Sequence, residues 1–295
     1  MWKRLKNSRH HILRQAGIWT GSVYAILGFL RMFVSLEGLF DSSASFWNKL
    51  LISFIILLGV WCLFLLISGG CVLLRKKVKV INGRNGRAVY VTYGDLFDKK
   101  LVPKSTEKRN ICFAVNRCFD TIVDEHLISS QTIHGYALKR LYDQGIYTPQ
   151  SLDQAIQKAL PINSHYVTLS SNQKPKGNLK RYDVGTAVDI PVSHELNYFM
   201  IGVSSFNVDL KAETSRDEYV LAIQRMIDFY DAHSQGYPIL MPIIGGFLSR
   251  TGQSEIDLLK FIIRTLKLNE DHINSDIYIV IREGAKNTIS LFNLI

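Results

Sequence analysis

The chain has 295 residues, a formal net charge of +10 and a hydrophobic content of 47%. The charge is uneven: residues 1–79 hold eleven Lys and Arg against two acidic residues, whereas residues 80–295 hold twenty-four against twenty-three. The positive excess therefore belongs to the first quarter of the chain. This distribution argues against a nucleic-acid-binding face on the rest of the protein.

Two apolar runs dominate residues 1–79. Residues 50–74 carry no charged side chain, and residues 15–36 carry only Arg31. Each run is long enough to cross a bilayer as a helix. Basic residues flank both outer ends, so the pattern predicts a two-helix transmembrane hairpin with both termini in the cytoplasm, as in a multi-pass protein of a bacterial inner membrane. A cleaved signal peptide is the alternative for the first run, which is longer than a usual signal core.

Small residues follow a four-residue spacing in the first run, at Gly17, Gly21 and Ala25, with Gly28 three positions further on. Such a stripe lets helices approach closely in lipid, either within the hairpin or between protomers. The alternative interpretation is that glycine is simply common in membrane helices.

Residues 80–295 alternate between strand-like and helix-like patterns. The turn-forming segment 82–86 separates two strands. Further strands are expected at 87–93, 110–115, 198–203, 237–244, 276–281 and 288–292, and helices at 133–142, 149–160, 216–233 and 254–266. This order predicts an α/β domain with a mixed sheet between helical layers. The four cysteines form no CxxC pair, and no Cys/His spacing matches a zinc site.

Polar and glycine-containing segments follow three of these strands, where ligands bind in α/β folds. They are Gly94–Leu96, Asn116–Arg117 with the loop Ser129–Thr132, and the run from Gly245 to Arg250. Glycines permit close backbone approach to a phosphate, and free N–H groups at a helix start bind anions.

These segments resemble a macro domain, an ADP-ribose-binding α/β/α module. Gly94-Asp95-Leu96 is similar to the family's strand end whose Asp holds the adenine, and Val115-Asn116 to the strand end near the distal ribose. Ile133-His134 resembles the end of its first phosphate loop, and Pro242 to Gly252 its second. The usual second Asn and the glycine triplet are absent, because Arg117-Cys118-Phe119-Asp120 and Ser129-Ser130-Gln131 stand in their places.

With the apolar hairpin, the chain resembles the transmembrane–macro effectors of Thoeris antiphage systems, to which the segments 115–124 and 180–186 are also similar. The resemblance implies an α/β/α domain over residues 80–295 behind a membrane hairpin over 1–79. It further implies an antiviral, abortive-infection effector rather than an enzyme, which self-associates and damages the lipid bilayer. Its ligand is expected to be an ADP-ribose conjugate, made from NAD by a TIR-domain partner. It implies no cofactor, no metal and no nucleic-acid partner.

Carried onto this sequence, the resemblance implies ligand contacts at the three strand ends and in the segment around Asp183. The residues are Asp95, Leu96, Asn116, Arg117, Ser129, Ser130, Gln131, Thr132, Asp183, Gly185, Thr186, Gly245, Gly246, Phe247, Leu248, Ser249 and Arg250.

Two questions stay open at this stage. A membrane-tethered ADP-ribosyl hydrolase, or a reader of ADP-ribosylated proteins, is the alternative function; a hydrolase would need a base, with Asp120, Asp124 and Asp183 as candidates. The basic loop 172–181 is either solvated surface or a lid over a pyrophosphate. His134 is expected to be a structural residue at a helix start.

Overall fold

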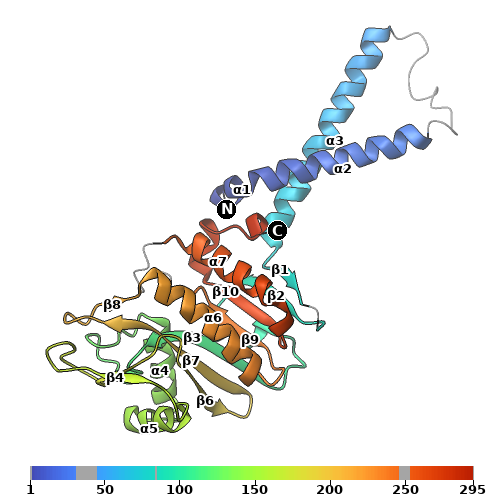
Figure 1. The fold of residues 1–295 in the computed structure, drawn as a ribbon. Helices are drawn as coiled ribbons and strands as arrows, with labels where there is room; N and C mark the ends of the chain where they lie inside the picture. The colour runs from blue at the N-terminus through green and yellow to red at the C-terminus, as the bar shows by residue number, and fades with distance from the viewer. Residues whose placement is uncertain (1, 31–44, 84, 246–252, 295) are drawn as a thin grey trace. The chain divides into compact units, whose positions relative to one another are not determined.

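The computed structural model describes residues 2–30, 45–83, 85–245 and 253–294. The chain divides into two compact units (Figure 1). One contains residues up to Lys76 together with those from Gly284 onward, and the other is an α/β domain of residues Lys77–Glu283. The sequence pattern predicts the first boundary after residue 79. It does not predict that the C-terminal segment joins the helical unit.

The helical unit contains α1 (Trp2–Asn7), α2 (Arg9–Leu30) and α3 (Phe46–Leu74). Among the described residues, α3 is the one helix that is long and apolar enough to cross a membrane. The expected first span, 15–36, coincides with α2 as far as Leu30, and its residues 31–36 lie outside the described chain.

Helix α2 turns Ile12, Ala16 and Thr20 inward, and the rings of Trp19 and Phe64 lie 5.6 Å apart across α2 and α3. Gly17 and Gly21 are exposed, and a Cβ built on either would meet no atom within 4 Å. The small-residue stripe therefore does not form the α2–α3 contact.

The α/β domain contains ten strands and four α-helices within its described residues. The strands are β1 (Lys77–Asn82), β2 (Ala88–Tyr93), β3 (Arg109–Asn116), β4 (Tyr166–Thr168), β5 (Lys180–Tyr182), β6 (Ala187–Ser193), β7 (Leu196–Phe206), β8 (Ala212–Glu213), β9 (Ile239–Pro242) and β10 (Ile277–Ile281). The helices are α4 (Ile133–Asp143), α5 (Pro149–Ala159), α6 (Arg216–His233) and α7 (Glu255–Leu268). Helices of this domain have side-chain caps at their starts: Thr148 and Ser215 form capping boxes, and Ser254 caps α7.

The main sheet has the order β1-β2-β10-β9-β3-β7-β6, with β8 paired to β7. Strands β2, β10, β9, β3 and β7 are mutually parallel, while β1, β6 and β8 pair antiparallel to their neighbours. The short strands β4 and β5 form a separate ribbon. The expected mixed sheet is thus confirmed.

Alternate residues of the strands face different helices, as the two-residue period of a strand requires. Phe113 and Tyr198 share one core cluster with Leu138 of α4 and Leu152 of α5. Their sequence neighbours face the other way: the Phe199 ring lies 5.1 Å from that of Phe229 on α6. Helix α7 joins α6 on that side through Tyr219 and Phe261. The domain is therefore a three-layer α/β/α sandwich.

The strand expected at 288–292 is wrong. The chain instead forms two 3-10 helices there, η4 (Glu283–Asn287) and η5 (Leu291–Leu294). Ile289, Leu291 and Phe292 are buried, and Phe292 clusters with Ile12 of α2 and Val72 of α3. The apolar residues of this segment are buried against helices and not within the sheet. The local sequence pattern cannot distinguish a buried strand from another kind of buried segment.

Candidate functional site

The carboxyl ends of the parallel strands meet at one edge of the sheet. The strand registers pair Tyr93 with Ile281, Val280 with Pro242, and Ile111 with Leu240. The ends of β2, β10, β9 and β3, with Asp95, Glu283, Gly245 and Asn116 at or just after them, therefore lie along the same edge. Three of these four residues, Asp95, Gly245 and Asn116, are ones that the sequence assigns to the ligand. At about 4.8 Å per strand, β2 and β3 lie about 14 Å apart, so a molecule that spans them is extended.

Asp95 follows β2 in an exposed turn. Its Oδ1 accepts a hydrogen bond of 3.0 Å from the Phe97 N–H, which fixes the carboxylate next to the buried Leu96. The preceding Gly94 donates its N–H to the Ile281 carbonyl at 3.0 Å. The turn is therefore tied to the end of β10, and its carboxylate is available as an acceptor at the surface.

Asn116 closes β3 and is 3% exposed. Its Oδ1 accepts from the Cys118 N–H at 3.0 Å and from the Asp120 N–H at 3.5 Å, so the side chain builds the turn that follows. Phe119 in this turn has a φ of 52°, in the left-handed region that few non-glycine residues adopt. The Nδ2 of Asn116 is buried and meets no hydrogen-bond partner among the described residues. It is the one group of this side chain left to donate to a ligand.

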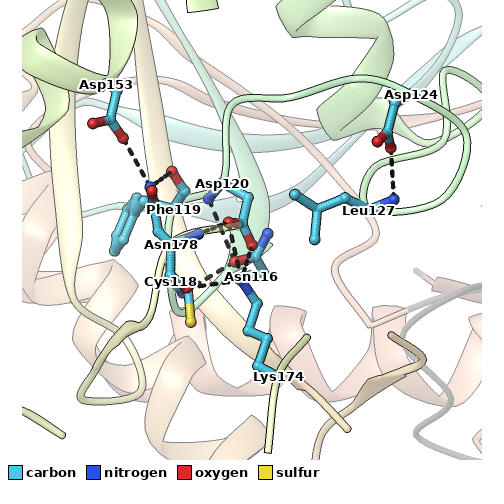
Figure 2. A network of polar contacts seen from close by, with 9 residues as sticks. All are labelled: Asn116, Cys118, Phe119, Asp120, Asp124, Leu127, Asp153, Lys174 and Asn178. Carbon is cyan, nitrogen blue, oxygen red and sulfur yellow. Dashed lines mark hydrogen bonds and ion pairs between the residues drawn. The ribbon is translucent and has the colours of Figure 1, made fainter. Parts of the chain in front are cut away.

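A buried ion pair supports this turn from below (Figure 2). The Lys174 Nζ lies 3.0 Å from Asp120 Oδ1 and 2.9 Å from Oδ2, and the side chains are 0% and 1% exposed. Burial raises the pKa of Asp120, while Lys174 and the Asn178 N–H oppose that rise. Both charges are thus held out of water, where removal of one partner is costly.

The loop that carries Lys174 is fastened at further points. Asn178 donates its N–H to Asp120 Oδ1 at 2.6 Å and its Nδ2 to Asp153 Oδ1 at 2.8 Å. Gly177 has a φ of +85°, and a Cβ there would collide with the Asp120 carboxylate. The basic loop 172–181 is therefore neither uniformly solvated nor free: its middle is packed under the turn after Asn116.

Glu125 sits on the loop that resembles the first phosphate loop. Its carboxylate accepts from Ser129 Oγ at 2.8 Å and from the Ser130 N–H at 3.0 Å. These hydrogen bonds lower the pKa of Glu125. Thr132 caps α4 by accepting from the Gly135 N–H. A carboxylate of the protein itself thus occupies the donors that a phosphate would use.

Arg117 clamps three parts of the domain together. Its Nε donates to the Tyr182 carbonyl and its Nη1 to Glu218 Oε1, both at 2.8 Å. Its own N–H donates to the Ser204 carbonyl. The guanidinium assigned to the ligand by sequence is therefore engaged with β5 and with the start of α6.

Asp183, Gly185 and Thr186 lead into β6, beside the end of β7. Gly185 has a φ of +78° and donates its N–H to the Gly202 carbonyl at 2.7 Å. Gly185 and Thr186 line a hollow of about 400 Å³ against α6. The Asp183 Oδ1 lies 3.3 Å from His165 Nδ1.

Gly245 follows β9 with a φ of +85°. A Cβ there would lie 2.5 Å from Cε2 of Tyr219, whose hydroxyl donates to the Ile244 carbonyl at 2.9 Å. Glycine is therefore needed for both conformation and space. Gly246, Phe247, Leu248, Ser249, Arg250 and Gln131 complete the expected set; the first five lie outside the described residues, and Gln131 is exposed beside Thr132.

Several titratable groups near the site are poorly suited to catalysis. Burial raises the pKa of the Cys118 thiol to about 11, so it is protonated at neutral pH. The contact with Lys176 and the Leu127 N–H lower the pKa of Asp124 to about 2, which makes it a weak base. Within the described residues, no group of three or more His, Cys, Asp and Glu side chains could hold a metal ion.

A family model for the macro domain of Thoeris protein ThsA matches residues 89–282. The chain belongs to this ThsA macro-domain family. The match starts in β2, ends just after β10 and so includes β3, β9 and β10 and nearly all of β2, the strands whose carboxyl ends carry residues expected to contact the ligand. The sequence-based assignment to a Thoeris effector with a macro domain is confirmed.

A curated relative is the Thoeris protein ThsA of Bacillus amyloliquefaciens (strain Y2), which is 25% identical over 212 residues. The alignment covers 70% of this chain and 63% of the relative. A crystal structure of a protein from Bacteroides thetaiotaomicron matches 64% of this chain and 96% of its own, with 12% identity and a TM-score of 0.36. At that TM-score it carries no functional argument.

Proposed function

We propose that this ThsA family member is a membrane-bound antiphage effector that senses an ADP-ribose-containing nucleotide. The nucleotide is made from NAD by a TIR-domain partner and binds at the carboxyl edge of the sheet. Binding drives self-association of the membrane helices and disruption of the bacterial inner membrane. The observation that carries the proposal is the family match across the strands whose carboxyl ends place Asp95, Gly245 and Asn116 at one edge of the sheet.

The chemistry of this edge fits such a ligand. The exposed Asp95 carboxylate is an acceptor for an amino group such as that of adenine. The buried Asn116 Nδ2 is a donor about three strands away. Between them, β9 ends in the turn at Gly245, whose φ of +85° other residues rarely adopt and which opens the segment that resembles the second phosphate loop.

The membrane part of the proposal rests on the two apolar runs. Helix α3 is long and apolar enough to span a bilayer, and α2 carries the first described part of the other run. We propose a hairpin with both termini in the cytoplasm, which places the α/β domain beside a cytosolic signal. A single hairpin offers no polar path through lipid, so membrane damage requires several copies.

We also propose that the domain binds and does not hydrolyse its ligand. Asp120 is committed to Lys174, and Asp124 is ionised with a pKa of about 2. Neither is a poised general base. Turnover of an ADP-ribosylated substrate that disappears on Asn116→Ala would favour the hydrolase alternative.

The decisive experiment is calorimetry on the full chain in detergent, titrated with ADP-ribose and with ADP-ribose conjugates. We expect saturable binding of at least one of them. No heat with any of these compounds, from protein with an intact circular dichroism spectrum, would contradict the proposal. Dye release from liposomes on ligand addition tests the output, and loss of release on deletion of residues 1–77 is the expected control.

A further inference from the structure

The chain leaves the α/β domain after β10, an inner strand of the sheet, and its last residues belong to the helical unit. Strand β10 lies between β2 and β9, yet the residues from Gly284 onward belong with residues 1–76. The name C-terminal strap is used below for residues 284–294, which contain most of η4 and all of η5.

Polar contacts fasten the strap to the first two helices. Ser290 and Ser8 place their hydroxyl oxygens 2.7 Å apart, and both residues are buried, with 5% and 2% exposure. Asn7 donates its Nδ2 to the Asn287 carbonyl at 2.8 Å. A buried hydroxyl pair is specific because neither member has water as a substitute partner.

An aromatic side chain fastens the strap to both long helices at once. Phe292 is 7% exposed and clusters with Ile12 near the start of α2 and with Val72 near the end of α3. The His11 ring lies 4.4 Å from its ring, and the Arg75 guanidinium carbon lies 5.6 Å from the ring centroid. Phe292 thus contacts both α2 and α3, at the end of the helical unit where α2 begins and α3 ends.

The other end of the strap begins at the carboxyl edge of the sheet, where the ligand is proposed to bind near Asp95, Asn116 and Gly245. This edge is called the ligand edge below. Glu283, the last residue of the α/β domain, comes two positions after β10, at the edge where Asp95 follows β2 and Gly245 follows β9. Ile281 accepts the hydrogen bond from the Gly94 N–H, next to Asp95. The first crossing between the units is at the same edge, because Lys77 pairs with Thr92 near the end of β2. Both covalent links to the helical unit therefore start at the edge where the ligand is proposed to bind.

We propose that the C-terminal strap transmits the state of the ligand edge to the contact between α2 and α3. A displacement of the Gly94–Leu96 turn or of the β9 end reaches Glu283 through β10, and the strap delivers it to Phe292. The first crossing alone would act only on α3, whereas Phe292 contacts both helices. This inference rests on the proposed function for its signal, but the coupling itself is a property of the chain without ligand.

Hydrogen–deuterium exchange on the full chain in lipid nanodiscs, without ligand, tests the coupling. The variant Phe292→Ala removes the ring, and Thr288→Ala is the matched control, since Thr288 is an exposed strap residue whose hydroxyl bonds only to Ala285 within the strap. We expect several-fold faster exchange at the Gly94 amide and in β10 for Phe292→Ala, and wild-type exchange for Thr288→Ala.

Two results would overturn the inference. Faster exchange confined to residues 2–30, 45–76 and 284–294 would mean that the strap only stabilises the helical unit. Equal changes in both variants would mean that the effect is not specific to the ring. Because Phe292→Ala could unfold the strap altogether, Ser290→Ala is measured beside it. That variant leaves the Ser8 hydroxyl without its buried partner and keeps the ring, and we expect the same pattern with a smaller amplitude.

A ligand-dependent arm separates this inference from the proposed function. Wild type and Phe292→Ala are titrated with ADP-ribose and tested for ADP-ribose-triggered dye release from liposomes of phosphatidylethanolamine and phosphatidylglycerol. We expect equal affinity and loss of release in the variant. Equal release would refute the strap. A wild type that shows neither binding nor release with ADP-ribose, nor with any of its conjugates tested in its place, would count against the proposed function, and the exchange data would still decide the coupling.

Discussion

Replacement of Lys174 by Met is expected to destabilise the α/β domain far more than a surface lysine would. The change keeps the length of the aliphatic stem but removes the charge that faces Asp120 at 2.9 Å. Breaking a buried pair by removing one partner costs about 3–5 kcal/mol, because the remaining charge stays buried. For a domain of this size about 1 kcal/mol shifts Tm by about 2–4 °C, so the expected drop is about 6–20 °C.

Lys176→Met is the matched control in the same loop. Lys176 also pairs with an aspartate, Asp124, but its side chain is 46% exposed. Exposed pairs contribute about 0–1 kcal/mol. The expected shift in Tm is therefore at most about 4 °C for the control.

Thermal unfolding of the full chain in detergent, followed by far-ultraviolet circular dichroism, measures these shifts. All four tryptophans precede residue 77, so their emission reports on the helical unit alone and is expected to be unchanged. The double variant Asp120→Asn/Lys174→Met is expected to be more stable than the sum of the single changes predicts. A Lys174→Met shift no larger than that of Lys176→Met would refute the reasoning.

Four further predictions concern the ligand, pH and self-association. Asp95→Ala removes a charged acceptor worth about 1.5–3 kcal/mol, so calorimetry is expected to show ADP-ribose affinity about 10–150-fold weaker. Asp98 is also exposed, and Asp98→Ala is the control that is expected to leave the affinity unchanged. Equal affinities of the two variants would remove Asp95 from the site. Glu125→Gln weakens the protein's own hold on Ser129 and Ser130 and is expected to tighten binding several-fold, whereas weaker binding would make Glu125 a support for the loop instead. Burial lowers the pKa of His134 from 6.5 to about 3, so below pH 6.5 the side chain stays neutral in the folded state but takes up a proton in the unfolded state. The free energy of unfolding should therefore fall by about 1.4 kcal/mol for each pH unit below 6.5. Denaturant titrations of His134→Gln at several pH values should lose this slope. Gly21→Leu fits in open space on α2 and is expected to leave ADP-ribose binding intact but abolish dye release. Ser22→Leu, at the neighbouring exposed position, is the control that is expected to keep both. Undiminished release from the Gly21→Leu variant would exclude the small-residue stripe from self-association.

The gathering of Asp95, Asn116 and Gly245 at one edge of the sheet could be predicted because it is built from local patterns in the sequence. Apolar runs mark β2, β3 and β9, and the residues that follow each run differ in kind from it, as in Gly94-Asp95 and Gly245. The rule that parallel strands end at one edge then brings distant residues together. Strands β10 and β9 lie between β2 and β3 and so set the distance between Asp95 and Asn116. This strand order could not be predicted, because no single segment of the sequence encodes it.

The supports of the site could not be predicted in the same way. Lys174 lies in a run with Lys176, Lys180 and Arg181, a composition typical of solvated surface. Its burial depends on Asp120, fifty-four positions earlier, and only the folded turn after Asn116 brings the two together. The contact of Glu125 with Ser130 depends likewise on the backbone of one irregular loop.

Residues that close the helical unit are translated after the entire α/β domain. The base of α2 and α3 receives Ser290 and Phe292 only when the intervening residues, roughly 200 of them, have been synthesised, which takes about 10–40 s at usual rates of translation. Until then, Ser8, Ile12 and Val72 lack partners that they have in the finished chain. A ribosome-bound or truncated chain therefore carries α2 and α3 with an incomplete base. If the chain acts as proposed, the order of synthesis separates insertion of these helices into the membrane from completion of the assembly that damages it.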